Sequence, residues 1–206
     1  MAIRFVYFDF GNVLFNFDHR RAARQMAAVA GVSEDRVWEV VFAGDLEHRY
    51  EAGQITSDEF YEQFCRATDT RPDRAKLMFA AGAIFELNTP IVPVVAQLQS
   101  AGHRTGVLSN TCECHWQYCV DGRFALLPGA FEQLVLSYEV RSMKPEAKIY
   151  DAAIEAAAVR SDEIFFIDDR QDNVDGALSA GIDAVLYESA GQCAAELKRR
   201  SLAFNY

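Results

Sequence analysis

Short apolar runs alternate with helical patterns along most of the chain, and this alternation predicts the fold class. The run at residues 3–8 has the length and the aromatic and β-branched content of a buried strand. Similar runs follow at 103–108, 131–137, 163–167 and 183–187, with helical stretches between them. Strands that alternate with helices form right-handed βαβ units and a parallel sheet. We therefore expect an α/β protein with a Rossmann-like, doubly wound core.

Residues from about 18 to 85 interrupt this alternation, because they carry mostly helical patterns and no convincing strand. The sequence from Thr56 to Glu59 has the form of a capping box that opens a helix. A helical insertion of this length is expected to form a second domain. The predicted division is a core of residues 1–16 and 88–206 and a helical cap of residues 17–87. We expect five aromatic side chains to pack inside the cap: Trp38, Phe42, Phe60, Phe64 and Phe79.

Side chains with catalytic potential follow the predicted strands at the points where these strands end. They are Asp9, Ser109 with Asn110, Lys144, and Asp168 with Asp169. The carboxyl ends of parallel strands meet along one edge of a sheet, so these groups are expected to converge. Three carboxylates repel one another unless a cation lies among them, and hard oxygen ligands suit Mg²⁺. The sequence therefore predicts a magnesium site at this edge.

Composition limits the partners that the protein can have. Lys and Arg total 20 against 30 Asp and Glu, a net charge of −10, which argues against binding to nucleic acid or to an anionic membrane. The chain has five cysteines, no signal-peptide pattern and no apolar run of membrane-spanning length, so we expect a cytoplasmic protein. A phosphorylated substrate needs local positive charge, which Lys144 supplies. We expect a small phosphorylated metabolite as partner, and a monomer or weak homodimer.

Four motifs at these strand ends resemble, in order, those of the haloacid dehalogenase (HAD) superfamily. They are Asp9-Phe10-Gly11-Asn12-Val13, Ser109-Asn110-Thr111, Lys144-Pro145 and Asp168-Asp169-x-x-x-Asn173. The helical insertion falls where that superfamily places its C1-type cap. Within the superfamily the chain is similar to the bacterial sugar-phosphatase group typified by α-D-glucose-1-phosphate phosphatase. The similarity includes the Asp-x-Gly-Asn-Val variant of the first motif and the cap sequence Glu51-x-Gly53-x-Ile55-Thr56.

The resemblance implies a Mg²⁺-dependent phosphatase that works through an aspartyl-phosphate. Asp9 would be the nucleophile that attacks phosphorus. The metal ion would be held by Asp9, by the backbone carbonyl of Gly11 and by Asp169. Positioning and charge neutralisation would carry most of the acceleration, as is usual for phosphoryl transfer.

The resemblance also implies roles for the remaining strand-end residues. Ser109 and Lys144 would bind the phosphoryl group that is transferred, with Asn110 nearby. Asp168 would orient Lys144 or a metal-bound water.

Gly11 departs from the pattern of most phosphatases in this superfamily, which carry at that position an Asp that protonates the leaving oxygen. Either activity is weak or absent, or the substrate needs less acid assistance. A sugar 1-phosphate meets the second condition, because its hemiacetal oxygen is a better leaving group than an ordinary alcohol. Two alternatives remain: a 2-haloacid dehalogenase that uses Asp9 on carbon without a metal, and a pseudo-enzyme that binds a phosphometabolite. The pair Asp168-Asp169 argues for a metal and against the dehalogenase.

Several other groups have a weaker claim on function. The cluster Cys112-x-Cys114-His115-x-x-x-Cys119 matches no ordinary structural zinc spacing, so we interpret it as ordinary helix residues. Arg141 stands where related sequences tend to have Gly, and it would either alter the loop before Lys144 or reach the site. Five cap residues are expected mainly as solvated surface groups, with a minor chance of contacting substrate: His19, Asp45, His48, Arg49 and Glu51. Hinges between cap and core are expected at residues 15–18 and 87–90.

Overall fold

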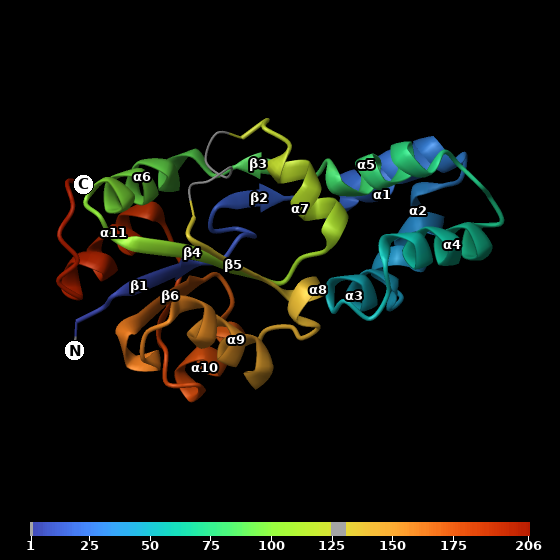
Figure 1. The fold of residues 1–206 in the computed structure, drawn as a ribbon. Helices are drawn as coiled ribbons and strands as arrows, with labels where there is room; N and C mark the ends of the chain where they lie inside the picture. The colour runs from blue at the N-terminus through green and yellow to red at the C-terminus, as the bar shows by residue number, and fades with distance from the viewer. Residues whose placement is uncertain (1, 125–130) are drawn as a thin grey trace.

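A five-stranded parallel sheet forms the core of the fold (Figure 1). The computed structural model describes residues 2–124 and 131–206. The strand order is β5-β4-β1-β6-β7, and every pairing is parallel. The strands are β1 (Phe5–Phe8), β4 (Arg104–Ser109), β5 (Gln133–Leu136), β6 (Ile164–Asp168) and β7 (Asp183–Leu186). The predicted α/β, doubly wound core is confirmed, and all five carboxyl ends lie along one edge.

Helices cover both faces of this sheet (Figure 1). On one face lie α6 (Val92–Ser100) and α11 (Ala190–Arg199), and on the other lie α9 (Ala147–Ala157) and α10 (Gln171–Ser179). Side chains of β1 alternate between these layers, since Val6 and Phe8 belong to one buried cluster and Phe5 and Tyr7 to the other. The hydroxyl of Tyr7 donates to the carbonyl of Ala153 at 2.9 Å, which satisfies its buried polar end.

The residues between β1 and β4 include a helical segment that lies beside the carboxyl ends of the strands (Figure 1). It consists of α1 (His19–Ala30), α2 (Glu34–Val37), a π-helical turn (Trp38–Phe42), α3 (Leu46–Glu51), α4 (Ser57–Thr68) and α5 (Arg74–Gly82). The capping box predicted at Thr56 and Glu59 is present, and it starts α4. Helix α1 ends at Gly31, which has the left-handed conformation (φ 72°) that favours glycine.

Two short strands connect this segment to the core. β2 (Phe15–Phe17) and β3 (Phe85–Leu87) pair antiparallel, with Phe17 opposite Phe85. The expectation of no strand in residues 18–85 is therefore wrong at its far end, and β2 was not expected either. Three-residue strands are too short to produce a readable alternation, and these two are held by pairing across about 70 residues of chain. The predicted hinge at 15–18 includes β2, the one at 87–90 begins at the last residue of β3, and hinge motion at these positions stays a prediction.

Shorter elements complete the described chain. They are α7 (Glu113–Val120), α8 (Ser137–Val140) and 3₁₀ turns at Thr89–Ile91 and Ser161–Glu163. In the helical segment Phe60 and Phe64 are buried as predicted, and Trp38 and Phe42 are half-buried, stacked with ring centroids 5.1 Å apart. The prediction is wrong for Phe79, which is 56% exposed and contacts the edge of Tyr118 from outside.

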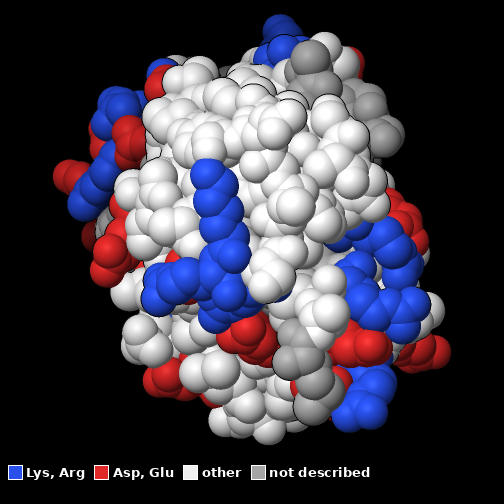
Figure 2. All heavy atoms as spheres, turned by 90° about the vertical axis from the view of Figure 1, so that its left-hand side faces the viewer, with Lys and Arg blue, Asp and Glu red and all other residues white. Residues whose placement is uncertain are grey.

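Charged side chains of both signs share the face at the amino ends of the strands. Figure 2 shows basic groups next to acidic ones there, below a broad uncharged area. Arg104 pairs with Glu132, and Arg200 pairs with Asp183, both at strand starts. The net negative charge therefore does not make this face uniformly acidic. Among the residues that the structure describes, no helix combines the length and the apolar character needed to cross a bilayer.

Candidate active site

Asp9 and Lys144 meet at the centre of the carboxyl edge of the sheet. Asp9 follows β1 directly, and its Oδ1 accepts hydrogen bonds from the backbone N–H of Phe10 at 2.7 Å and from Lys144 Nζ at 2.7 Å. Lys144 Nζ also donates to Asp168 Oδ2 at 2.6 Å and to the carbonyl of Leu108 at 2.9 Å. All three ammonium protons are thus used, which compensates the burial of this cation. Three distant chain segments are joined here by a single side chain.

Burial and charge act in opposite directions on this pair. Burial lowers the pKa of Lys144, but the carboxylates of Asp168 and Asp9 outweigh it and raise that pKa, so the amine stays charged. Burial raises the pKa of Asp9 to about 8, against the attraction of Lys144 and with the support of Asp168. A divalent cation beside Asp9 would favour its ionised form, which is the form that a nucleophile needs.

The two carboxylates at the end of β6 are held differently. Asp168 is fully buried, and the amide of Asn173 donates to its two oxygens at 3.0 and 3.2 Å. The backbone N–H of Arg170 adds a bond to Asp168 Oδ1 at 2.9 Å. Asp169 is less buried, and its Oδ2 accepts from the amide of Asn12 at 2.8 Å. Asp168 is therefore locked against Lys144, whereas Asp169 faces the open side of the site.

The donor set at this edge fits a magnesium ion. One carboxylate oxygen each of Asp9, Asp168 and Asp169 lies within 4.8 Å of the others. The carbonyl of Gly11 accepts the N–H of Val13 at 2.7 Å, and it retains a second lone pair. Hard oxygen ligands with room for water and a substrate oxygen suit Mg²⁺. The geometry is compatible with the predicted ligands Asp9, Gly11 and Asp169, whose role stays a prediction.

Ser109 and Asn110 lie next to Lys144 but differ in access. Ser109 is fully buried, and its hydroxyl donates to the carbonyl of Asn110 at 3.2 Å. The side chain of Asn110 accepts the backbone N–H of Lys144 at 2.8 Å and donates to its carbonyl at 2.9 Å. Asn110 thus fixes the backbone that presents the ammonium group. Asn110 and Thr111 line the cavity described next, whereas Ser109 lies behind them.

A cavity of about 360 Å³ opens in front of Asp9. Its core side includes Gly11, Asn12, Asn110, Lys144, Asp169, Arg170 and Asn173. The remaining lining includes residues of the helical segment, of strands β2 and β3 and of α7, namely His19, Glu51, Phe17, Phe85 and His115. The expectation that His19 and Glu51 are solvated surface groups is therefore wrong. Asp45, His48 and Arg49 do not line this cavity, and Asp45 pairs with Arg49 at 3.6 Å.

Burial sets the charge of the groups opposite Asp9. It raises the pKa of Glu51 to about 7, with Lys144 opposing, because an ionised carboxylate is poorly solvated there. It lowers the pKa of His115 to about 3 and also lowers that of His19, so both imidazoles are neutral near pH 7. The backbone of Glu51 is anchored to the core, since the hydroxyl of Ser137 donates to its carbonyl at 2.7 Å. Near pH 7 this side of the cavity therefore offers two neutral imidazoles and a carboxyl group that is close to its titration midpoint.

Arg141 does not belong to the cavity. It is exposed and follows α8 in the left-handed conformation (φ 55°), which favours glycine. Its carbonyl accepts from Lys148 Nζ at 3.3 Å. The structure therefore favours an effect of Arg141 on the loop before Lys144 over direct contact between Arg141 and a substrate.

The sequence analysis missed the cavity residues Phe17, Phe85 and His115. Phe17 and Phe85 lie in the strands that pattern did not reveal, and His115 was interpreted as an ordinary helix residue. In the sequence, the cap motif that begins with Glu51, noted through the family resemblance, was the one indication of a residue on this side of the cavity.

Comparison with known proteins agrees with this geometry. The model of the haloacid dehalogenase-like hydrolases matches residues 3–181, and the chain belongs to that family. Phosphatase MT3486 of Mycobacterium tuberculosis is 28% identical over 205 residues, which cover 93% of this chain and 90% of that protein. D-ribitol-5-phosphate phosphatase of Bacteroides thetaiotaomicron is 23% identical, over 95% of this chain and 97% of that protein.

Solved structures share the fold along almost the whole chain. The crystal structure of the HAD family enzyme bt-2542 from B. thetaiotaomicron, in complex with magnesium and inorganic phosphate, superposes with a TM-score of 0.79 at 25% identity, and the match covers 91% of this chain and 96% of that one. L-2-haloacid dehalogenase from Xanthobacter autotrophicus gives a TM-score of 0.64 at 22% identity, with 98% and 84% coverage. At this identity, the similarity to the dehalogenase shows a shared fold alone.

Proposed function

We propose that this hydrolase is a Mg²⁺-dependent phosphatase that acts on small phosphorylated metabolites. The observation that carries the proposal is the meeting of Asp9, Lys144, Asp168 and Asp169 beside one cavity. An ammonium group supported by the buried carboxylate of Asp168 can bind a phosphoryl group, and the carboxylates of Asp9 and Asp169, with oxygens within 4.8 Å of one another, can bind a divalent cation. The magnesium and phosphate complex of a 25% identical relative supports the same reading.

In the proposed reaction Asp9 attacks phosphorus, and the bond between phosphorus and the leaving oxygen breaks. Lys144, fixed by Asp168 and Asn110, binds the oxygens of the phosphoryl group as it transfers. When bound by Asp9, Asp169 and the carbonyl of Gly11, Mg²⁺ would neutralise the charge on those oxygens. Water then hydrolyses the aspartyl-phosphate, which regenerates Asp9 and releases inorganic phosphate.

Sugar phosphates, such as a sugar 1-phosphate, are the proposed substrates. Gly11 provides no acid for the leaving oxygen, and the ring of Phe17 occupies the adjoining space, since a Cβ on Gly11 would lie 2.8 Å from it. A hemiacetal leaving group needs less protonation than an alcohol. The relative named for ribitol 5-phosphate supports a phosphorylated polyol or sugar. Residues 17–87 would act as the cap that selects it, with His19, Glu51 and His115 available for its hydroxyls.

A phosphate-release screen over a metabolite panel tests the proposal, with Mg²⁺ or EDTA present and with Asp9→Asn as the matched inactive variant. We expect release that requires both Mg²⁺ and Asp9. Activity that survives EDTA or Asp9→Asn would refute the mechanism. Halide release from 2-haloacids without metal would establish the dehalogenase alternative, and binding without turnover would establish the pseudo-enzyme.

A further inference from the structure

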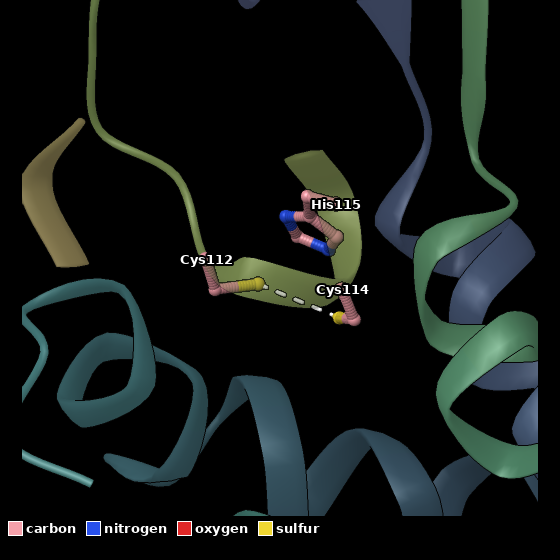
Figure 3. A group of neighbouring side chains, drawn as sticks. All are labelled: Cys112, Cys114 and His115. Carbon is pink, nitrogen blue, oxygen red and sulfur yellow. Dashed lines mark hydrogen bonds between the residues drawn. The ribbon is translucent and has the colours of Figure 1, made fainter. Parts of the chain in front are cut away.

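Two cysteine sulfurs lie side by side where helix α7 begins (Figure 3). Cys112 precedes the helix and Cys114 is in its first turn, and both are buried. Their Sγ atoms are 3.6 Å apart. Two thiolates on one tetrahedral zinc ion, each about 2.3 Å from the metal, would be about 3.8 Å apart. The pair therefore already has nearly the spacing of two zinc ligands.

His115 supplies a third ligand from the same turn. A ligand atom of His115 and the two sulfurs all lie within 4.8 Å of one another, and Figure 3 shows the imidazole over the sulfur pair. The ring is buried, and the neutral imidazole that burial favours is the form that coordinates a metal. The carbonyl of Ala81 accepts a hydrogen bond from this ring. Histidines that bind metals usually donate their other N–H to such a partner.

The helical segment places two carboxylates beside His115, and these are the candidates for a fourth ligand. Glu47 and Glu51 each place a carboxylate oxygen within 4.8 Å of His115 and of one another. Glu51 is the nearer candidate, since its Oε1 lies 3.9 Å from His115 Nδ1. Glu51 lies about 60 residues before this turn in the sequence, so the spacing of the cysteines alone does not indicate it.

We propose that Cys112, Cys114, His115 and Glu51 form a binding site for a single zinc-class transition-metal ion between α3 and α7. Thiolate and imidazole ligands select Zn²⁺ over Mg²⁺, whereas the all-oxygen group at Asp9 has the opposite preference. This site shares Glu51 and His115 with the lining of the cavity, but the argument for it does not depend on the proposed phosphatase reaction. Among the described residues, the other cysteines belong to no such group of potential ligands.

Metal binding at this site has two physical consequences. Each thiol must lose its proton to solvent when it binds the ion, so affinity should increase with pH. The ion would also join the helical segment to the core, because Glu51 belongs to the first and the cysteines to the second. Binding to the folded state alone would then raise the thermal midpoint Tm. Both His115 and Glu51 line the cavity, so the ion would narrow it.

Titration of the metal-free protein with Co²⁺ tests the site, because thiolate-to-cobalt charge transfer gives a near-ultraviolet band that Co²⁺ at the carboxylates lacks. We expect one equivalent to saturate the band and raise Tm. Cys112→Ser and Cys114→Ser should each weaken binding at least about tenfold, and Glu51→Gln should weaken it by a similar factor. Cys119→Ser is the matched control, since Cys119 is buried on the same helix, and it should bind like the wild type.

X-ray absorption of the wild-type zinc protein provides a readout that needs no variant. We expect two sulfur ligands and at least one imidazole. A coordination shell of oxygen alone, absence of the cobalt band, or a band that persists in the Cys112→Ser, Cys114→Ser double variant would overturn the proposal.

Discussion

Gly11→Asp is the sharpest test of how the leaving group is handled. Gly11 does not have the left-handed conformation, so its backbone accepts a side chain. The new Cβ would lie 2.8 Å from Cε1 of Phe17, whose ring is 36% exposed and can turn toward solvent. Displacing such a ring from its rotamer costs about 0.5–1.5 kcal/mol. The variant should therefore fold with only a small loss of stability.

The expected gain is in turnover of ordinary alkyl phosphates. A positioned general acid contributes about 10²–10⁴-fold, and because Phe17 crowds this position we expect the lower end, about 100-fold. Sugar 1-phosphates, with their better leaving group, should gain much less. The assay is steady-state kcat/KM for both substrate classes with Mg²⁺. Gly11→Asn is the control of equal size that cannot donate a carboxyl proton. Equal rates in the two variants, or no change in either, would refute this account of Gly11.

Three further changes test other parts of the structure. Asn173→Ala removes the amide that binds both oxygens of Asp168, and urea denaturation should show a loss of about 1–3 kcal/mol in the free energy of unfolding. Arg141→Gly relieves a left-handed conformation, which should add about 1 kcal/mol and raise Tm; an unchanged Tm would mean no strain there. Glu51 has a folded-state pKa of about 7 against an ordinary 4.5, so its ionisation destabilises the fold as pH rises from about 5 to 8. With chelator present, Glu51→Gln should therefore become progressively more stable than the wild type over this range, and a difference independent of pH would contradict the raised pKa.

The core side of the site was predictable because one rule of topology places it. Asp9 follows β1 and Asp168 ends β6, both strands are recognisable as apolar runs, and parallel pairing brings their ends together. Lys144 comes after β5 and α8, and backbone hydrogen bonds to Asn110 bring it to the same edge. The sequence did not show that Ser109 would lie behind Asn110, because a displacement of one residue at a strand end reverses the direction of a side chain.

The opposite side of the cavity was not predictable, because no local pattern determines it. Glu51 ends a six-residue helix that pattern did not reveal, and His115 is an ordinary helical residue until the helical segment packs against it. Their pKa values depend on burial that exists only in the assembled fold. The same packing brings Glu51 next to His115, which groups with Cys112 and Cys114, and the proposed zinc site rests on this arrangement.

The paired strands β2 and β3 change how motion of the helical segment has to be understood. Both connections to the core run through this antiparallel pair, so neither can bend alone without breaking its ladder. Asn88 also fixes the strand pair to the core. Its backbone N–H donates to the carbonyl of Leu14 at 3.0 Å, and its side-chain amide donates to the carbonyl of Val13 at 2.8 Å. If the helical segment moved away from the core, strands β2 and β3 would then rotate as a unit and carry Phe17 and Phe85 with them. Because Phe17 occupies the space beside Gly11, the position of the helical segment determines how much room a leaving group has at the point where the acid is missing.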